Sequence, residues 1–290
     1  MKSGRVAQGG RGRRLEVKAG ALLLAAGVAL AAGVPWPAGS GGAARAESPP
    51  VWKTARNGCG ELTFAGARFI ACHFDARKYR LRTWLADEKG EPFGWLWRLD
   101  EWLKRRGQRL LFAMNGGMYR PDYKPAGLYI EEGRELSRLN LRRGGGNFHL
   151  LPNGVFWMKG ARAGVTESRR FAQAYKRGRL RPNFATQSGP MLVLGGRLHP
   201  RFRPRSDSLK IRNGVGVRRN GHDVYFAISL EPVNFHTFAR LFRDALKTPD
   251  ALFLDGTVSR LWWKEQRVRG LFNRRIGPIV GVAERIEVAE

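Results

Sequence analysis

The residues best suited to do chemistry lie at the end of a short apolar segment, in the stretch DALFLDGTVS (residues 250–259). The apolar residues 251–254 predict a buried strand that holds the carboxylate of Asp255 rigidly, while Gly256 lets a ligand approach the backbone. Ser259 follows four residues after this carboxylate. A carboxylate held in this way is suited to act as a base or as a nucleophile. The alternative is an Asp-Gly turn that closes a hairpin, a common role for this dipeptide.

Three further corners of the sequence place polar residues beside glycine after an apolar segment. Strand ends of this kind often build clefts. Their side chains are mostly uncharged in a chain with 52 Lys and Arg residues, which indicates hydrogen-bonding groups around a ligand. The candidate substrate-binding residues are Asn115, Gly116, Gly117, Gln187, Ser188, Gly189, Asn213, Gly256 and Ser259.

Arg212 and Glu231 complete the candidate catalytic set with Asp255. A guanidinium can hold a phosphate through two parallel N–H donors and stabilise the charge that develops on it. Glu231 follows the apolar segment 224–230 and is the best candidate if a second carboxylate is required. The alternative interpretation of Arg212 is an ordinary surface arginine, since this chain has many.

Several familiar motifs do not occur in this sequence. It has no phosphate-binding G-x-x-x-x-G-K-S/T, no H-E-x-x-H, no C-x-x-C and no Gly-rich dinucleotide fingerprint. Its five histidines lack metal-ligand spacing, so we predict no metal and no cofactor. Ser188 in TQSGP lacks the leading glycine of a nucleophile elbow, which makes a Ser–His–Asp esterase a distant third hypothesis.

The elements that must position these corners include two predicted helices. In residues 233–247, apolar side chains recur at helical spacing, and Pro249 ends the segment. Residues 94–106 predict an amphipathic helix that ends at Gly107. We expect the later helix to pack on a sheet through Phe238, Leu241, Phe242 and Leu246.

Strand-forming segments and glycine-containing turns fill most of the remaining chain. Residues 61–74 and 78–86 predict strands, and the basic segment 159–183 predicts an inserted helix or a mobile loop. Together they predict a single α+β domain over residues 51–290, with a largely antiparallel, hairpin-rich sheet and flanking helices. The predicted hairpins are 127–137 with a turn at Glu132-Gly133, 147–158 at Asn153-Gly154, 190–198 at Gly195-Gly196, and 211–229 at Asn220-Gly221.

Residues 1–46 have the features of a signal peptide. A basic start is followed by the apolar segment 19–34 and by Ala44-Arg45-Ala46, a small-x-small cleavage pattern. Residues 47–50 form a spacer before the domain. We therefore predict export to the periplasm or secretion, with retention as an N-terminal anchor as the alternative. The export route, general or twin-arginine, stays open.

Export makes the two cysteines interpretable. Cys59 and Cys72 are the only cysteines, and neither stands in a zinc-like pattern. A matched pair in an exported protein favours a disulfide, and two buried free thiols are the alternative.

The chain is strongly basic, with a formal net charge of +28. Without the seven Lys and Arg and the one Glu of residues 1–46, the charge is still +22. An exported protein seldom meets nucleic acid, so an anionic or phosphate-bearing glycan is the expected partner, with contact to the membrane surface as a second one. The alternative is that the arginines only solvate the surface.

Seven segments of the sequence, taken in order, resemble the exported bacterial branch of the phosphodiester glycosidase family, which is related to the lysosomal uncovering enzyme. The resemblance covers about residues 108–285. Two positions depart from the family pattern: Met118 precedes Tyr119, and Thr257 replaces the second glycine after Asp255. The segments are AMNGGMY (113–119), PAGLYIEEG (125–133), GNFHLLPNGVF (146–156), ATQSGPMLV (185–193), IRNGVGV (211–217), FAISLEPVNFHTFARLFRD (226–244) and DALFLDGTVSRLW (250–262).

The resemblance implies a hydrolase that cleaves a sugar–phosphodiester linkage in an envelope or exopolysaccharide-type substrate. Because the leaving group is already a phosphate, one carboxylate and a cation could replace the usual pair of carboxylates. The alternative is a non-catalytic periplasmic binder of anionic glycan. In the enzyme, Asp255 and Arg212 should converge in one closed pocket, whereas a binder should present an open basic groove with exposed aromatic residues.

Overall fold

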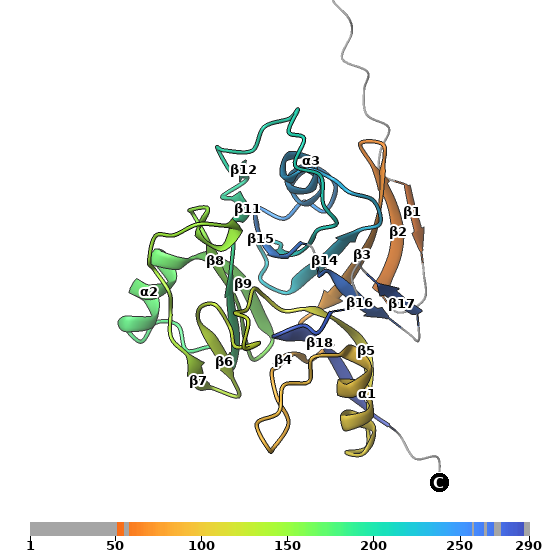
Figure 1. Ribbon diagram of the computed structural model, residues 1–290, viewed down its shortest axis with the longest axis vertical. Coiled ribbons are helices and arrows are strands. Elements are labelled where there is room, and N and C mark those ends of the chain that lie inside the picture. Colours follow the sequence, from red (N-terminus) through yellow and green to blue (C-terminus); the bar gives the residue numbers. More distant parts are fainter. Residues whose placement is uncertain (1–50, 55–57, 257, 264–265, 270–273, 287–290) are drawn as a thin grey trace, which may run out of the picture. The chain divides into compact units, whose positions relative to one another are not determined.

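Antiparallel strand pairing organises this protein. The computed structural model describes residues 51–54, 58–256, 258–263, 266–269 and 274–286. Every strand pairing among these described residues is antiparallel. The strands and their flanking helices form one α+β domain, which confirms the predicted fold class (Figure 1). The predicted signal peptide (1–46) and spacer (47–50) lie outside the described residues, and so does Thr257.

The largest sheet among the described residues has eight strands and contains the strand that ends at Asp255. The two strands at one edge, Met191–Leu194 and Arg197–Leu198, form the hairpin that we predicted at Gly195-Gly196. The order across the sheet is β1 (Val51–Thr54), β2 (Cys59–Phe64), β3 (Ala67–Asp75), β14 (Asp223–Ser229), β13 (Asn213–Val217), β15 (Asp250–Asp255), β11 (Met191–Leu194) and β12 (Arg197–Leu198).

The described residues also form two five-stranded sheets. One has the order β7 (Arg134–Ser137), β6 (Tyr129–Glu131), β10 (Phe184–Ser188), β8 (Gly154–Lys159) and β9 (Arg162–Glu167). The other has the order β17 (Gln266–Arg269), β16 (Arg260–Trp263), β5 (Gln108–Asn115), β18 (Ile279–Arg285) and β4 (Leu81–Trp84).

The period of two along β15 divides its side chains between two cores. Leu252 and Leu254 belong to the larger core, while Ala251 and Phe253 belong to the core beneath the late helix. Alternate residues of a strand point to opposite faces of its sheet. The register between β13 and β15 shifts just before Asp255, so this alternation ends at Leu254.

The helix predicted over residues 233–247 forms in two segments, α3 (Phe235–Arg240) and the π-helical turn η3 (Leu241–Ala245). Asn234 caps α3, because its side-chain oxygen accepts a hydrogen bond from the N–H of Thr237 at 2.8 Å. These segments pack on the eight-stranded sheet, as expected. The apolar side chains predicted to face the sheet are all fully buried: Phe238, Leu241, Phe242 and Leu246.

Two other α-helices occur in the described residues. The amphipathic helix predicted over 94–106 is α1 (Leu96–Lys104), which buries Leu99 and Leu103. The segment 159–183, predicted as an inserted helix or a mobile loop, contains β9 and α2 (Ser168–Lys176). The carboxylate of Glu167 caps α2, since it accepts from the N–H groups of Arg169 and Arg170 at 3.0 and 2.9 Å.

The predicted hairpins at Glu132-Gly133, Gly195-Gly196 and Asn220-Gly221 all form. The hairpin predicted at Asn153-Gly154 is wrong. Asn153 is buried and its side chain donates to a backbone oxygen, while Gly154 begins β8, whose hairpin partner is β9. Residues before it form the short 3-10 helix η2 (Asn147–His149). Segment 61–74 is also a hairpin, β2–β3, rather than one strand.

The predicted disulfide joins β2 and β3. Cys59 and Cys72 are directly paired in the sheet, and the bond between them lies within the larger core. It ties the strand pair at the edge of the sheet to strands nearer its centre.

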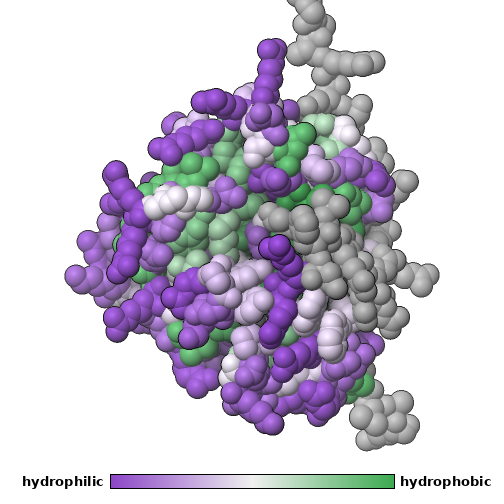
Figure 2. Space-filling view, in the orientation of Figure 1, coloured by the Kyte–Doolittle hydropathy of each residue, from purple (hydrophilic) through white to green (hydrophobic). Residues whose placement is uncertain are grey.

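The surface is rich in charge. Hydrophilic side chains cover most of the face seen in Figure 2, and hydrophobic residues appear there only in patches between them. Of the helices in the described part of the chain, none is long and apolar enough to span a bilayer.

Candidate active site

Asp255 lies where the chain leaves one sheet and enters another. It ends β15 of the eight-stranded sheet, and the chain then continues into β16 of a five-stranded sheet. β15 pairs with β13 and β11, whereas β16 pairs with β5 and β17. Asp255-Gly256 is therefore a crossover and not the turn of a hairpin. The hydroxyl of Ser259 donates to the carbonyl oxygen of Gly256 at 2.7 Å, which fixes the crossover.

Asn115, at the end of β5, ties the second sheet to this crossover. Its side-chain Nδ2 donates to Asp255 Oδ2 at 3.0 Å and to the carbonyl oxygen of Val258 at 2.8 Å. Its Oδ1 accepts from the N–H of Arg260 at 2.7 Å. The side chain is fully buried. We predicted a contact with the substrate, but these polar atoms all bond within the protein, so the geometry is that of a residue that positions the carboxylate.

Two more hydrogen bonds fix Asp255, one to its carboxylate and one from its backbone N–H. Its Oδ1 accepts from the N–H of Gly256 at 2.6 Å, and its own N–H donates to Asn213 Oδ1 at 2.7 Å. Burial raises the pKa of Asp255 to about 6, while the hydrogen bonds from Gly256 and Asn115 act in the opposite direction. At neutral pH this carboxylate is therefore mainly ionised and close enough to its pKa to exchange a proton.

Arg212 is almost fully buried, with 1% of its surface exposed. Its Nε donates to the carbonyl oxygen of Val233 at 2.8 Å, and its Nη2 donates to that of Ser208 at 2.8 Å. The guanidinium stacks on the ring of Phe235, 3.6 Å from the centroid. Burial lowers the pKa of Arg212 to about 10, so it stays protonated at neutral pH. Among the hydrogen bonds of the described residues, none uses Nη1.

Arg212 and Asp255 line the same cavity, whose volume is about 360 Å³. Gly256 lines it too, so three of the predicted site residues meet there. The register supports this meeting, because Asn213 of β13 pairs directly with Asp255 of β15. The other residues around the cavity are Met118, Tyr119, Asn147, Ser208, Lys210 and Val258.

Gln187 lies outside the lining of this cavity, although we predicted a substrate contact for it. Its Oε1 accepts from the N–H groups of Leu128 and Asn140 at 3.0 and 2.9 Å. Its Nε2 donates to the carbonyl oxygen of Asn140 at 2.7 Å and to the hydroxyl of Ser168 at 3.0 Å. These four bonds join β10 to neighbouring segments, which is a structural task.

Four other predicted binding residues also lie outside the lining and take part in packing. The hydroxyl of Ser188 donates to the carbonyl oxygen of Leu254 at 2.9 Å. The other three are glycines packed so closely against neighbouring segments that a side chain would clash with them. An added Cβ would lie 2.9 Å from backbone at Gly116, 2.6 Å from a threonine oxygen at Gly117 and 2.6 Å from an asparagine Cβ at Gly189.

Glu231, the predicted second carboxylate, forms an ion pair with Arg68 at 2.7 Å on the surface. The side chains are 39% and 60% exposed, respectively. The hydrogen bond from Arg68 lowers the pKa of Glu231. Because Glu231 does not line the cavity, the described residues leave Asp255 as the carboxylate of this site.

Sequence reasoning missed Lys210, Ser208 and Asn147 as residues of the cavity. Lys210 carries a usable signal, because it stands two residues before Arg212 on an extended segment, where alternate side chains share a face. Ser208 precedes this segment and contributes its carbonyl oxygen to Arg212. Asn147 has no such signal, since it reaches the cavity from a distant short helix.

Tyr119 forms another part of the wall. Its hydroxyl donates to the carbonyl oxygen of Arg275 at 2.9 Å, and its ring stacks with that of Tyr123 at 5.9 Å. Burial raises the pKa of Tyr119 to about 12, and the nearby charge of Asp255 adds to the rise. Tyr119 is therefore a neutral, partly apolar surface beside the carboxylate.

The cavity combines one carboxylate with two cations. Asp255 can accept a proton, and Arg212 and Lys210 can hold a negatively charged group. The described residues contain no group of three or more His, Cys, Asp or Glu placed to hold a metal ion. Such a site can bind a molecule that carries a phosphate and activate water beside it.

Comparisons with known proteins give a consistent result. A family model for phosphodiester glycosidases matches residues 108–283. The uncharacterized protein YigE of Escherichia coli (strain K12) is 40% identical over 185 residues, which are 64% of this chain and 70% of that protein. The zebrafish N-acetylglucosamine-1-phosphodiester alpha-N-acetylglucosaminidase catalytic domain, auto-inhibited by its pro-peptide, has a similar fold, with a TM-score of 0.54 at 15% identity over 81% of this chain and 82% of that one. A hypothetical protein from Synechocystis gives 0.50 at 14% identity over 82% and 64%.

Proposed function

Because the chain belongs to the phosphodiester glycosidase family, we propose that it hydrolyses the bond between a sugar and a phosphodiester. The observation that carries this proposal is the single cavity lined by Asp255 and Arg212. A carboxylate with a pKa of about 6 and a stacked, protonated guanidinium are the groups that this reaction needs. The name of the similar zebrafish enzyme supports a sugar-1-phosphodiester as the class of substrate.

In the proposed reaction, water attacks the anomeric carbon of the sugar. The bond between that carbon and the phosphate oxygen breaks, and its electron pair stays on the phosphate. Asp255 accepts the proton that the water loses and later releases it to solvent. The products are a free sugar and a phosphomonoester. Attack by the carboxylate itself, followed by hydrolysis of the glycosyl ester, would use the same residues.

The two cations have a clear electrostatic task in this reaction. A phosphodiester carries one negative charge, and the departing phosphomonoester carries two. The charge that develops on the phosphate is stabilised by donors that are already in place. Val233 occupies the Nε edge of Arg212, so the phosphate would be held through Nη1 and the second hydrogen of Nη2. Lys210 adds a second positive charge to the same cavity.

The proposed substrate is a glycan of the cell envelope or an exopolysaccharide. The formal net charge of +28 favours an anionic polymer over a neutral one. The disulfide between Cys59 and Cys72 supports action in an oxidising compartment such as the periplasm or the exterior, as the proposed export requires.

The test is an assay of the purified protein against a panel of sugar-1-phosphodiesters that differ in sugar and anomer. We expect release of the free sugar together with a phosphomonoester from at least one member. Binding of the panel without any product would instead support a non-catalytic binder of anionic glycan. Release of the sugar 1-phosphate together with the free alcohol would show that the other ester bond is cut and would contradict cleavage at the anomeric carbon.

A further inference from the structure

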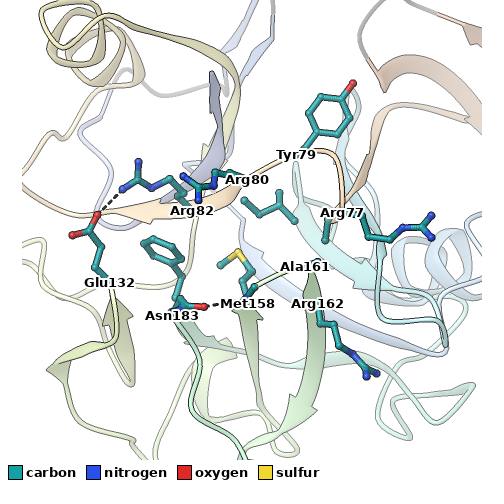
Figure 3. A pocket seen from close by; sticks show the side chains of 13 residues that line it. Arg77, Tyr79, Arg80, Arg82, Glu132, Met158, Ala161, Arg162 and Asn183 are labelled. Atoms are coloured by element: carbon teal, nitrogen blue, oxygen red, sulfur yellow. Dashed lines mark hydrogen bonds and ion pairs between the residues drawn. The ribbon is translucent and has the colours of Figure 1, made fainter. Parts of the chain in front are cut away.

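A second cavity lies apart from the candidate active site and shares no lining residue with it. It opens between β4, the connection that precedes β4, and the β8–β9 hairpin (Figure 3). Its volume is about 590 Å³, larger than the 360 Å³ of the first cavity. This is within the range of cavities that hold small organic ligands.

The floor of this cavity is apolar. Leu81 and Met158 belong to the larger core and expose only 5% and 3% of their surface. Phe184 packs against the same core and presents its ring beside them. A floor of this kind excludes water from one side of a ligand and suits the C–H faces of a sugar ring.

The rim carries four arginines and one glutamate. Arg77 is held by Asp75 through hydrogen bonds of 2.7 to 3.2 Å, and Arg82 is paired with Glu132. The guanidinium of Arg82 also lies 5.6 Å from the ring centroid of Phe184, so its orientation is fixed over the floor. Two of the four positive charges are thus already balanced by carboxylates.

The other two arginines, Arg80 and Arg162, stand on different sides of the cavity. Arg80 precedes β4, and Arg162 begins β9 on the facing hairpin (Figure 3). Both residues are exposed. Neither side chain forms an ion pair or a hydrogen bond with another residue of the described part of the chain. Their charges are therefore uncompensated beside an apolar floor.

The walls are fixed before any ligand arrives. The N–H of Asn183 donates to the carbonyl oxygen of Met158 at 2.8 Å, and its Oδ1 accepts from the N–H of Gly160 at 2.9 Å. The N–H of Ala163 donates to the carbonyl oxygen of Gly221 at 2.8 Å. These bonds hold the β8–β9 hairpin in place, and preorganised walls reduce the entropy lost on binding.

We propose that this cavity binds a saccharide that carries a phosphate or carboxylate group. The sugar ring packs on Leu81, Met158 and Phe184, and the anion is attracted by the uncompensated charges of Arg80 and Arg162, whose exposed side chains can turn toward it. An anionic glycan chain that is cut at the first cavity would gain a second point of attachment here. That last role rests on the proposed function, whereas the binding itself does not.

The experiment compares two pairs of substitutions that remove the same charge. Arg80→Ala with Arg162→Ala removes the two uncompensated arginines of the rim, and Arg169→Ala with Arg170→Ala removes two exposed arginines of α2 that do not line the cavity. Both pairs are made in full-length protein carrying Asp255→Asn. The probe is a fluorescent hexamer of N-acetylglucosamine joined through phosphodiesters, followed by anisotropy. A neutral β-linked hexamer and free glucose 1-phosphate serve as competitors.

We expect the rim pair to weaken hexamer binding by about tenfold or more, since two charge-assisted contacts are lost, while the α2 pair has a much smaller effect. The neutral hexamer should not compete. Competition by glucose 1-phosphate would show that a free sugar phosphate also fits the site, and its failure would assign the site to polymer. Equal weakening by both pairs, or competition by the neutral hexamer, would overturn the proposal.

A second measurement separates this site from the first cavity. With Asp255 intact, the rim pair should leave the turnover of a small sugar-1-phosphodiester unchanged, because such a molecule fills only the first cavity. A parallel loss of turnover would contradict two separate sites. If the protein turns over no sugar-1-phosphodiester, the proposed function fails, and the affinity comparison still decides whether this cavity binds an anionic saccharide.

Discussion

Asp255 has a pKa that burial raises from 3.8 to about 6, and this has a consequence for stability. Between about pH 4 and pH 6, the folded protein holds a proton on Asp255 that the unfolded chain has lost. The free energy of unfolding should therefore fall as the pH rises through this interval and stay lower above it, by at most about 3 kcal/mol.

Urea unfolding at pH 4, 5, 6 and 7 measures this contribution as the difference between the wild type and Asp255→Asn. We expect the variant to gain stability relative to the wild type as the pH rises from 4 to 6. Gln173→Ala, at an exposed position of α2, changes no titratable group and is the control that should show no such change. Equal behaviour of the two variants would contradict the raised pKa.

Arg212→Lys tests whether the guanidinium itself is needed. A lysine keeps the positive charge but loses the stacking on Phe235 and the paired donors of the Nη edge. We expect turnover of a sugar-1-phosphodiester to fall by about tenfold or more. The variant also loses the hydrogen bonds to Val233 and Ser208, so its unfolding midpoint is measured beside its kinetics. A folded variant with normal turnover would show that only charge matters at this position.

Sequence reasoning selected Asp255 and Arg212 as candidates because each stands at the end of a buried strand that can be recognised locally, and the structure places both at one cavity. It could not assign Asn115 or Gln187, because the partners of their side chains come from distant segments. The amide of Asn115 reaches a carboxylate 140 residues away. Gln187 bonds to a loop 47 residues before it in the sequence. An amide beside glycine looks the same in a sequence whether it faces a ligand or the protein.

At the scale of elements, the late helix is the support of the site. α3 and η3 carry Phe235, on which Arg212 stacks, and they bury Leu241 completely against the sheet. Leu241→Ala should lower the free energy of unfolding by about 2–5 kcal/mol, through lost burial and the cavity left behind. Denaturant unfolding measures this loss. Gln173→Ala, at an exposed position of α2, should change stability by no more than about 0.5 kcal/mol, and an equally small effect of Leu241→Ala would show that η3 is not anchored.

The elements themselves were mostly predictable, because their patterns are local. Apolar spacing located α1, α3 and β15, and glycine turns located three hairpins. The prediction at Asn153-Gly154 failed because that dipeptide also suits a buried corner, where Asn153 bonds to the backbone of Phe148. The choice of sheet is not local. Nothing within residues 250–263 indicates that β15 and β16 pair in different sheets, yet this crossover places Asp255.

At the scale of the whole molecule, two sheets meet near the site, and segments far apart in the sequence share one cavity. β15 ends at Asp255 and β13 follows directly after Arg212 in one sheet, and β5 supplies the asparagine that bridges from another. The second cavity uses the edge of the same β5-containing sheet, at β4. One domain thus carries two separate cavities, and we propose that the first cleaves an anionic glycan and the second holds it.

The most direct test of this account measures turnover and binding together in Asp255→Asn, with the best substrate of the sugar-1-phosphodiester panel. The amide has nearly the size and shape of the carboxylate but cannot accept the proton of water. We expect substrate affinity to stay within a few-fold of the wild type, while the single-turnover rate falls by at least about a hundredfold. A variant that binds and turns over the substrate as the wild type does would contradict the assignment of Asp255 as the catalytic carboxylate.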